Sequence, residues 1–257
     1  MSDSQSTESS ASSQRFDGGM FLYDKPVLLS KEAHGNMGLS RSEQPYAFVR
    51  DVKGLPVVVN ELQTAQKHYP IVFSDFENPV LIAVVGIIDD KNLFVNDAGE
   101  WAADLYVPSY ARCHPFAFAH REGDEFAVVI DESSNAISSS PEVPFFDGDD
   151  LSEVTQQRVD FCGQLNEAKQ STIAFCQRIK DLGLLNGQRV TQTTDDGSEE
   201  KIADYVSIDP SRLNELDKDT LQELHQDGSL SAIFAQLFSL ENWNRLIARR
   251  NRLLEIN

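Results

Sequence analysis

The sequence lacks the short motifs by which metal sites and common enzymes are recognised. It contains no HExxH, no paired CxxC, no GxSxG nucleophile motif, no GxGxxG dinucleotide fingerprint and no GxxxxGK[ST] phosphate loop. Cysteine is also scarce, with three residues. Cys162 and Cys176 fall about 21 Å apart on one predicted helix, too far for a disulfide, and Cys113 beside His114 reads as a buried, inert thiol. We therefore expect no metal site, no disulfide framework and no cofactor.

Basic residues are few. The chain has 22 Lys and Arg against 41 Asp and Glu, a formal net charge of -19 and a pI near 4.5. Proteins that bind nucleic acids usually carry basic patches, so this balance excludes nucleic acid as the expected partner. Four arginines do gather near the end of the chain. We interpret them as residues of the last turns of a helix, where they complement its dipole: Arg245, Arg249, Arg250 and Arg252.

Long apolar runs are missing as well. The longest, PVLIAVVGII, has ten residues, whereas a membrane-spanning helix needs about 18 or more. The first residues, MSDSQSTESSASSQ, have neither a basic start nor an apolar core, so they predict no Sec-type signal peptide. We expect a disordered serine-rich tail over 1–15 and a cytoplasmic protein, with non-classical export to the cell surface as the alternative.

What the sequence does contain predicts an α+β fold, with a mixed or antiparallel, β-rich N-terminal half and a helical C-terminal half. Residues 16–148 form the β-rich region, with short helices, and a repeated order of helix, proline, strand and acid within it suggests an internal duplication. Residues 149–257 form the helical region, expected to pack on the first and to carry one inserted hairpin around DDG. The strands expected in the first half are YAFV (46–49), PIVFSDF (70–76), PVLIAVVGII (79–88), LFVN (93–96) and EFAVVID (125–131).

Helix signals are clearest in the second half. An apolar stripe at three- and four-residue steps predicts one long helix over 150–182, ended by Gly183. Asp209 before Pro210 predicts a capped helix start, and Gly228 a helix end. A final helix is expected from Ser229 to the end of the chain. In the first half, Asn60 is expected to cap a short helix that ends at the proline of QKHYP.

Two groups of residues are candidates for a functional site. The first would supply a base, a hydroxyl donor, an acid and an anion anchor for catalysis: His68, Tyr69, Asp75, Arg112 and His114. The second consists of aromatic residues that could line a ligand pocket or a partner-binding face, with core packing as the competing interpretation: Trp101, Tyr106, Tyr110 and Phe116.

A succession of segments resembles the SapC family of bacterial proteins over residues 20 to 250. In chain order, the segments are HYPIVFSD, NLFVNDAGEW, YVPSYARCHPFAFA, VVIDESS, FFDGDD, FCGQLNEAKQSTIAFCQRIKDLGLL and LHQDGSLSAIFAQLFSLENWNRL. The family takes its name from a protein of a bacterial surface-layer locus, and its members are often encoded near genes for flavin-dependent halogenase-like proteins and TonB receptors. A peptide-transport permease shares the name, but that permease spans the membrane.

The resemblance assigns no catalytic residues, and it implies a modest function. We expect a non-catalytic binding or accessory protein associated with surface-layer or outer-membrane uptake systems, whose partner is an unknown protein or small ligand. The alternative is an uncharacterised small-substrate tailoring enzyme with a pocket that contains His68 and His114. A structural component of the surface layer is a third reading, disfavoured by the modest length and the lack of repeats.

Overall fold

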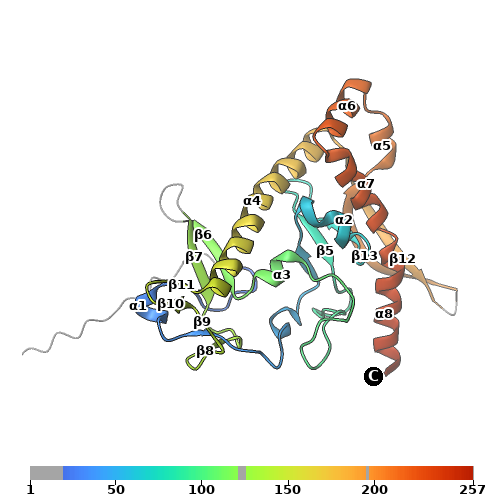
Figure 1. The fold of residues 1–257 in the computed structure, drawn as a ribbon. Helices are drawn as coiled ribbons and strands as arrows, with labels where there is room; N and C mark the ends of the chain where they lie inside the picture. The colour runs from blue at the N-terminus through green and yellow to red at the C-terminus, as the bar shows by residue number, and fades with distance from the viewer. Residues whose placement is uncertain (1–19, 121–125, 195–196, 257) are drawn as a thin grey trace, which may run out of the picture. The chain divides into compact units, whose positions relative to one another are not determined.

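The computed structural model describes residues 20–120, 126–194 and 197–256, and its contacts divide the chain into two units (Figure 1). Unit 1 contains Met1–Ser42 and His114–Cys162, and unit 2 contains Glu43–Cys113 and Gly163–Asn257. Each unit therefore combines two segments that are distant in the sequence. The predicted serine-rich tail, 1–15, lies outside the described residues.

The main sheet of unit 1 is three-stranded and antiparallel, in the order β1-β7-β6. Val129 and Ile130 of its middle strand are fully buried, and because consecutive side chains point to opposite faces, both faces of the sheet are covered there. Phe116 and Phe145 extend this core with an edge-to-face ring contact at 5.7 Å. The strands are β1 Pro26–Leu28, β6 Phe116–His120 and β7 Phe126–Asp131.

Two smaller sheets and a short helix complete unit 1. Gly38 lies where two strands approach so closely that a Cβ would be 2.1 Å from the Val143 carbonyl oxygen, so this position requires glycine. The order of the second sheet is β8-β2-β9, and β10 pairs with β11. These elements are α1 Lys31–His34, β2 Gly38–Leu39, β8 Ile137–Ser138, β9 Val143–Pro144, β10 Phe146–Asp147 and β11 Asp150–Leu151.

Unit 2 is built on a five-stranded antiparallel sheet in the order β12-β13-β4-β5-β3. Its inner strands carry fully buried apolar residues, Ile71 and Leu81 among them. The long hairpin of β12 and β13 forms one side of this sheet (Figure 1). The strands are β3 Gly54–Pro56, β4 Ile71–Phe73, β5 Leu81–Val84, β12 Leu185–Thr193 and β13 Glu199–Ile208.

A glutamine from a helix connects two strands of this sheet. β13 and β4 share a single register pair, Val206 opposite Phe73. Beyond that pair, the fully buried Gln236 donates to the Ile71 carbonyl at 2.8 Å, and its Oε1 lies 3.4 Å from the Ile208 N–H. The amide of this side chain therefore occupies positions that backbone groups would fill in a continuous ladder.

Helix α7 packs against β13 and β4 of this sheet, and α8 contacts the hairpin. The rings of Trp243 on α8 and Tyr205 on β13 lie 5.1 Å apart at a tilt of 43°, and Arg250 makes a two-point ion pair with Glu200. The longest helix, α4, begins in unit 1, continues in unit 2 and ends before Gly183, whose φ is +66°. The helices are α2 Leu62–Ala65, α3 Ser109–Cys113, α4 Glu153–Asp181, α5 Pro210–Asn214, α6 Lys218–Gln226, α7 Ser229–Ser239 and α8 Asn242–Ile256.

The structure confirms the α+β class, the long helix with its glycine stop, the hairpin, and the helix start capped by Asp209. Four local predictions were wrong. YAFV contains a 3-10 helix, Ala47–Val49, and LFVN contributes only an isolated bridge between Val95 and Trp101. The short helix after VVV is entered through a 3-10 turn, Val59–Glu61, in which the Glu61 carboxylate, rather than Asn60, accepts the Val58 N–H.

The fourth error concerns the final helix, which is two helices. α7 ends at Ser239 and α8 begins at Asn242, whose side-chain amide donates to the carbonyls of Ser239, Gln66 and Tyr69. These bonds stabilise the break, which an apolar stripe alone does not reveal. Within the described part of the chain, no helix is both long enough and apolar enough to span a membrane.

Candidate functional site

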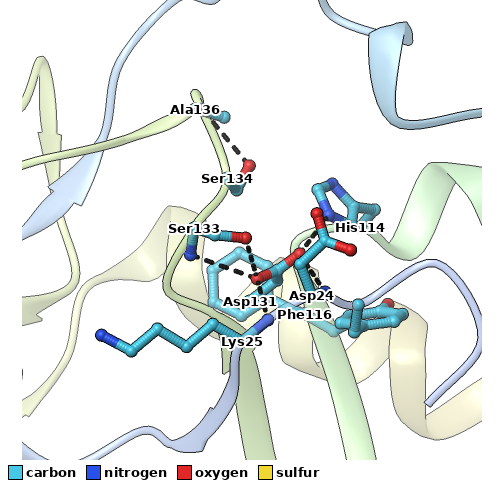
Figure 2. A network of polar contacts seen from close by, with 9 residues as sticks. Asp24, Lys25, His114, Phe116, Asp131, Ser133, Ser134 and Ala136 are labelled. Carbon is cyan, nitrogen blue, oxygen red and sulfur yellow. Dashed lines mark hydrogen bonds and ion pairs between the residues drawn. The ribbon is translucent and has the colours of Figure 1, made fainter. Parts of the chain in front are cut away.

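A buried carboxylate, Asp131, is the centre of a polar network in unit 1 (Figure 2). Its Oδ1 accepts the N–H of Lys25 at 3.0 Å, and the N–H and hydroxyl of Ser133 at 3.1 and 2.6 Å. Its Oδ2 accepts the N–H of Asp24 at 3.1 Å and lies 3.3 Å from Nε2 of His114. The carboxylate therefore joins the chain before β1, the turn after β7 and the chain before β6.

Burial alone would raise the pKa of Asp131, but its hydrogen bonds hold that pKa well below its usual range. The largest of the opposing effects comes from His114, followed by Ser133 and the two backbone amides. The His114 side chain is itself 6% exposed, and its ring lies 5.3 Å from that of Tyr23. The network favours an ionised carboxylate that holds three segments together.

Phe116, a candidate for ligand contact, lies in the core of unit 1. Its side chain is fully buried against Phe145, and its carbonyl oxygen accepts the hydroxyl of Tyr23 at 2.6 Å. An aromatic ring in this position stabilises the sheet and contacts no open surface.

A second polar network, in unit 2, is centred on Glu61. Its Oε2 accepts the Tyr106 hydroxyl at 2.7 Å and the Ser109 N–H at 2.8 Å, and its Oε1 accepts the Val58 N–H at 2.9 Å. Arg112 donates to the Tyr106 and Ser109 hydroxyls at 2.9 and 2.8 Å. Burial and the nearby Glu61 carboxylate raise the pKa of Tyr106. Two candidates, Tyr106 and Arg112, thus bond to each other directly, and the Tyr106 hydroxyl also donates to Glu61, an acid that the sequence interpretation missed.

Tyr69 and Trp101 form the apolar side of the same network. Tyr69 is fully buried, and its hydroxyl donates to the Tyr106 carbonyl and accepts from Trp101 Nε1 at 3.2 Å. Phe94 packs edge-on against Tyr69 at 4.8 Å. Burial raises the pKa of Tyr69 far above its ordinary value. This hydroxyl is held neutral in the core, a poor position for a proton donor to a substrate.

The remaining candidates lie apart from these networks. His68 is half-buried, and burial together with Arg245 and Lys67 lowers its pKa. Asp75 is exposed and accepts the N–H groups of residues 77 and 78, as turn aspartates commonly do. The Tyr110 ring lies 5.0 Å from the Lys169 ammonium, and burial raises the pKa of its hydroxyl to about 12.

His68 belongs to unit 2 and His114 to unit 1, and each contacts groups of its own unit. In the described residues, no group of three or more His, Cys, Asp and Glu side chains is arranged to hold a metal ion.

Two signals in the sequence pointed to the missed residues. Asp131 follows the apolar run FAVVI directly, and an acid at the end of a predicted buried strand is a signal for a buried carboxylate. Gly187 interrupts the alternation of LNGQRVTQT, and a glycine inside a strand pattern often marks a close approach.

That glycine borders an open groove of about 660 Å³ in unit 2. Phe76, between β4 and β5, is 47% exposed there, and a Cβ added to Gly187 would lie 3.7 Å from its ring. Small-molecule and peptide sites are commonly concave, largely apolar and of this size. The lining residues are Val72, Phe73, Ser74, Phe76, Ile82, Gly187, Gln188, Arg189, Asp204, Tyr205 and Val206.

Charged residues form one rim of the groove. Arg189 Nε donates to Asp204 Oδ1 at 2.7 Å, and Lys201 Nζ lies 2.5 Å from Asp204 Oδ2. The hydrogen bonds from these two cations lower the pKa of Asp204 to about 2. The rim thus combines two cations with one carboxylate, beside an apolar floor.

These features define an α+β protein whose buried polar networks tie its segments together and whose second unit carries an open groove. The chain belongs to the SapC family, whose family model matches residues 29–246. No curated protein matched the chain, and no solved structure did.

Proposed function

We propose that this SapC-family chain is a non-catalytic binding protein that recognises a partner protein through the groove of unit 2. The open groove with the 47% exposed Phe76 in its lining carries this proposal, because concavities lined largely by apolar side chains commonly mark binding sites. Burial of one large apolar side chain of the partner would contribute about 2 kcal/mol. In keeping with the resemblance, the proposed role is that of an accessory to surface-layer or outer-membrane uptake systems.

Two further observations support this role. Two of the candidate catalytic side chains, Tyr69 and His114, are buried, and their hydrogen bonds belong to networks that stabilise the fold. All three cysteines are buried and none forms a disulfide, as is common in the reducing cytoplasm, which we propose as the compartment. The alternative, an enzyme that uses His68 and His114, has weaker support because these residues contact separate surroundings.

The proposal is tested by site-specific photo-crosslinking in the native host. The photoreactive amino acid p-benzoylphenylalanine replaces Phe76 in the groove or, as the control, Ile173, which is 61% exposed on α4. We expect one defined protein, identified by mass spectrometry as a surface-layer or uptake component, to be trapped from position 76 and not from position 173.

A groove-filling variant makes this test specific. Gly187→Val adds a branched side chain beside Phe76 in a backbone conformation that any residue adopts, and it raises β propensity, so the protein should still fold. It should abolish trapping from position 76, whereas Thr193→Val, at an exposed position of the same strand, should not. Equal trapping from both photoreactive positions, or trapping that Gly187→Val leaves intact, would refute the proposal.

A further inference from the structure

The strand that borders the groove presents an open edge. Within the described residues, β12 pairs with β13 and with no other strand, so it ends the order of the five-stranded sheet. With nine residues it is longer than a typical strand, and it contains neither proline nor lysine. Proteins usually protect long edge strands with such residues, because an open edge attracts another strand.

One hydrogen bond sets which groups of β12 face this edge. The Asp209 N–H donates to the Leu184 carbonyl at 2.8 Å, so the next pair, Leu185 opposite Ile208, is a non-hydrogen-bonded pair. Gly187 and Arg189, two and four residues further along, are likewise in non-hydrogen-bonded pairs with β13, because the register shifts only after Val190.

The N–H and C=O groups of Gly187 and Arg189 therefore point away from β13, toward the open edge. The edge is closed at its start, where Arg212 donates to the Leu185 carbonyl at 2.7 Å. Between the Leu185 carbonyl and the register shift after Val190, Gly187 and Arg189 are thus the two residues whose backbone groups face the open edge.

The side chains of the same two residues share one face of the strand, because they are two positions apart. Both residues are exposed, and both line the groove. Gly187 leaves space beside Phe76, whereas Arg189 extends a guanidinium with a 61% exposed side chain. Residues of an added strand that pair with Gly187 and Arg189 would place their own side chains on this face, over the groove.

We propose that the groove binds an extended peptide segment of the partner protein that adds to the edge of β12, with a large apolar residue opposite Gly187 and an acidic residue opposite Arg189. The assignment of an acid follows from the charges of the rim, where Asp204 already contacts two cations. If a partner carboxylate forms an ion pair with Arg189, Asp204 still has its ion pair with Lys201. The net charge of -19 opposes an acidic partner at long range, but salt screens that repulsion beyond about 10 Å.

This inference rests on the proposed function, and it is tested with synthetic peptides on the intact protein. The probes are acetylated, amidated peptides of alternating Thr and Val that carry Phe-Thr-Glu or Glu-Thr-Phe at the centre, because a strand can add in either direction. Binding is followed by NMR of the ¹⁵N-labelled protein. We expect one sequence order to shift the amide signals of residues 186–190 and to slow hydrogen exchange at Gly187 and Arg189.

N-methylation of the peptide separates strand addition from simple occupation of the groove. In the antiparallel order, Glu-Thr-Phe, the phenylalanine N–H would point toward β12 and the N–H of the central threonine away from it; in the parallel order, Phe-Thr-Glu, the two N–H groups exchange these roles. Methylation of the N–H that points toward β12 should weaken binding by about tenfold or more, and methylation of the other by less than about threefold. A Glu-to-Lys peptide should bind roughly fivefold more weakly to the natural protein and regain affinity for Arg189→Glu.

Two results would overturn strand addition, namely no binding of either peptide at about 1 mM or equal sensitivity to the two methylations. If crosslinking from position 76 still traps a partner, the proposed function survives that failure. If crosslinking fails as well, both proposals are refuted.

Discussion

Replacement of Asp131 by asparagine tests whether the network of unit 1 is structural. The carboxylate accepts hydrogen bonds from two backbone amides of the chain before β1, from the N–H and hydroxyl of Ser133, and from His114. Asparagine keeps one acceptor oxygen, but its NH₂ group replaces the other and faces groups that donate hydrogen bonds to Asp131. Loss of one or two charge-assisted bonds at this buried position should cost about 3 kcal/mol of unit 1 stability.

The assay must report on the correct unit. Both tryptophans, Trp101 and Trp243, belong to unit 2, so tryptophan fluorescence would not follow unit 1. Native-state hydrogen exchange with mass spectrometry should instead be measured on peptides from β6 and β7. The matched control is Asp149→Asn, which removes a carboxylate of the same unit whose side chain is 97% exposed and paired with Lys31. We expect that variant to stay within about 0.5 kcal/mol of the natural protein.

The dependence on pH supplies a second check. Because the folded-state pKa of Asp131 is depressed, its stabilising effect is present above the unfolded pKa of about 3.9 and is lost as the pH falls through the folded pKa. Asparagine does not titrate, so the difference in stability between the two proteins should be constant near neutral pH and shrink below about pH 3.9. A difference below about 0.5 kcal/mol at pH 7, or one that does not shrink in acid, would refute the structural role.

Three further outcomes are expected in unit 2. Gln236→Leu should cost about 3 kcal/mol in urea unfolding followed by tryptophan fluorescence, since it leaves the buried Ile71 carbonyl with only the Ser239 hydroxyl at 3.5 Å and removes the acceptor of the Ile208 N–H. Gln222→Leu, on the exposed side of α6, should cost less than about 0.5 kcal/mol. Tyr69→Phe should cost about 1–2 kcal/mol and shift the emission of Trp101, which loses its acceptor; unchanged emission would contradict the bond. Tyr110 should ionise near pH 12 in an ultraviolet titration of the natural protein compared with Tyr110→Phe. Its contribution to stability should be lost as the pH rises from about 10 toward 12. Ionisation near pH 10 would contradict the burial of this side chain.

The sequence was most informative where local signals decide the structure. The long helix, its glycine stop and the capped start at Asp209 all follow from periodicity and capping within a few residues. The errors came where distant groups prevail over local pattern. YAFV has β propensity, yet the backbone N–H of Tyr46 bonds to Gly99 and the segment turns into a 3-10 helix. The break after Ser239 depends on Asn242, two of whose partners, Gln66 and Tyr69, lie more than 170 residues away.

The candidate site shows the same limit. The sequence selected Tyr106 and Arg112 but not Glu61, which accepts the Tyr106 hydroxyl, because the acid is 45 residues from the tyrosine. His114 was selected without Asp131, although the acid closes a strand pattern that was predicted correctly. Residue type shows which side chains can perform chemistry, whereas burial and pairing decide whether they are free to do so.

The segments that carry the family resemblance have mostly a structural task in this chain. HYPIVFSD is held by Gln236 and Asn242, two residues of the last resembling segment, LHQDGSLSAIFAQLFSLENWNRL, through hydrogen bonds to the Ile71 and Tyr69 carbonyls. Two of the resembling segments are thus held together by contacts that maintain the fold.

The groove is lined both by segments that resemble the family and by a strand that does not. Val72 and Phe73 of its floor lie within HYPIVFSD, but Gly187 and Arg189 lie on β12, outside every resembling segment. In the proposed binding mode, these two residues provide the open edge, the space beside Phe76 and the charge of the rim, so substitutions at Gly187 and Arg189 should alter peptide binding in the NMR assay and leave urea unfolding nearly unchanged.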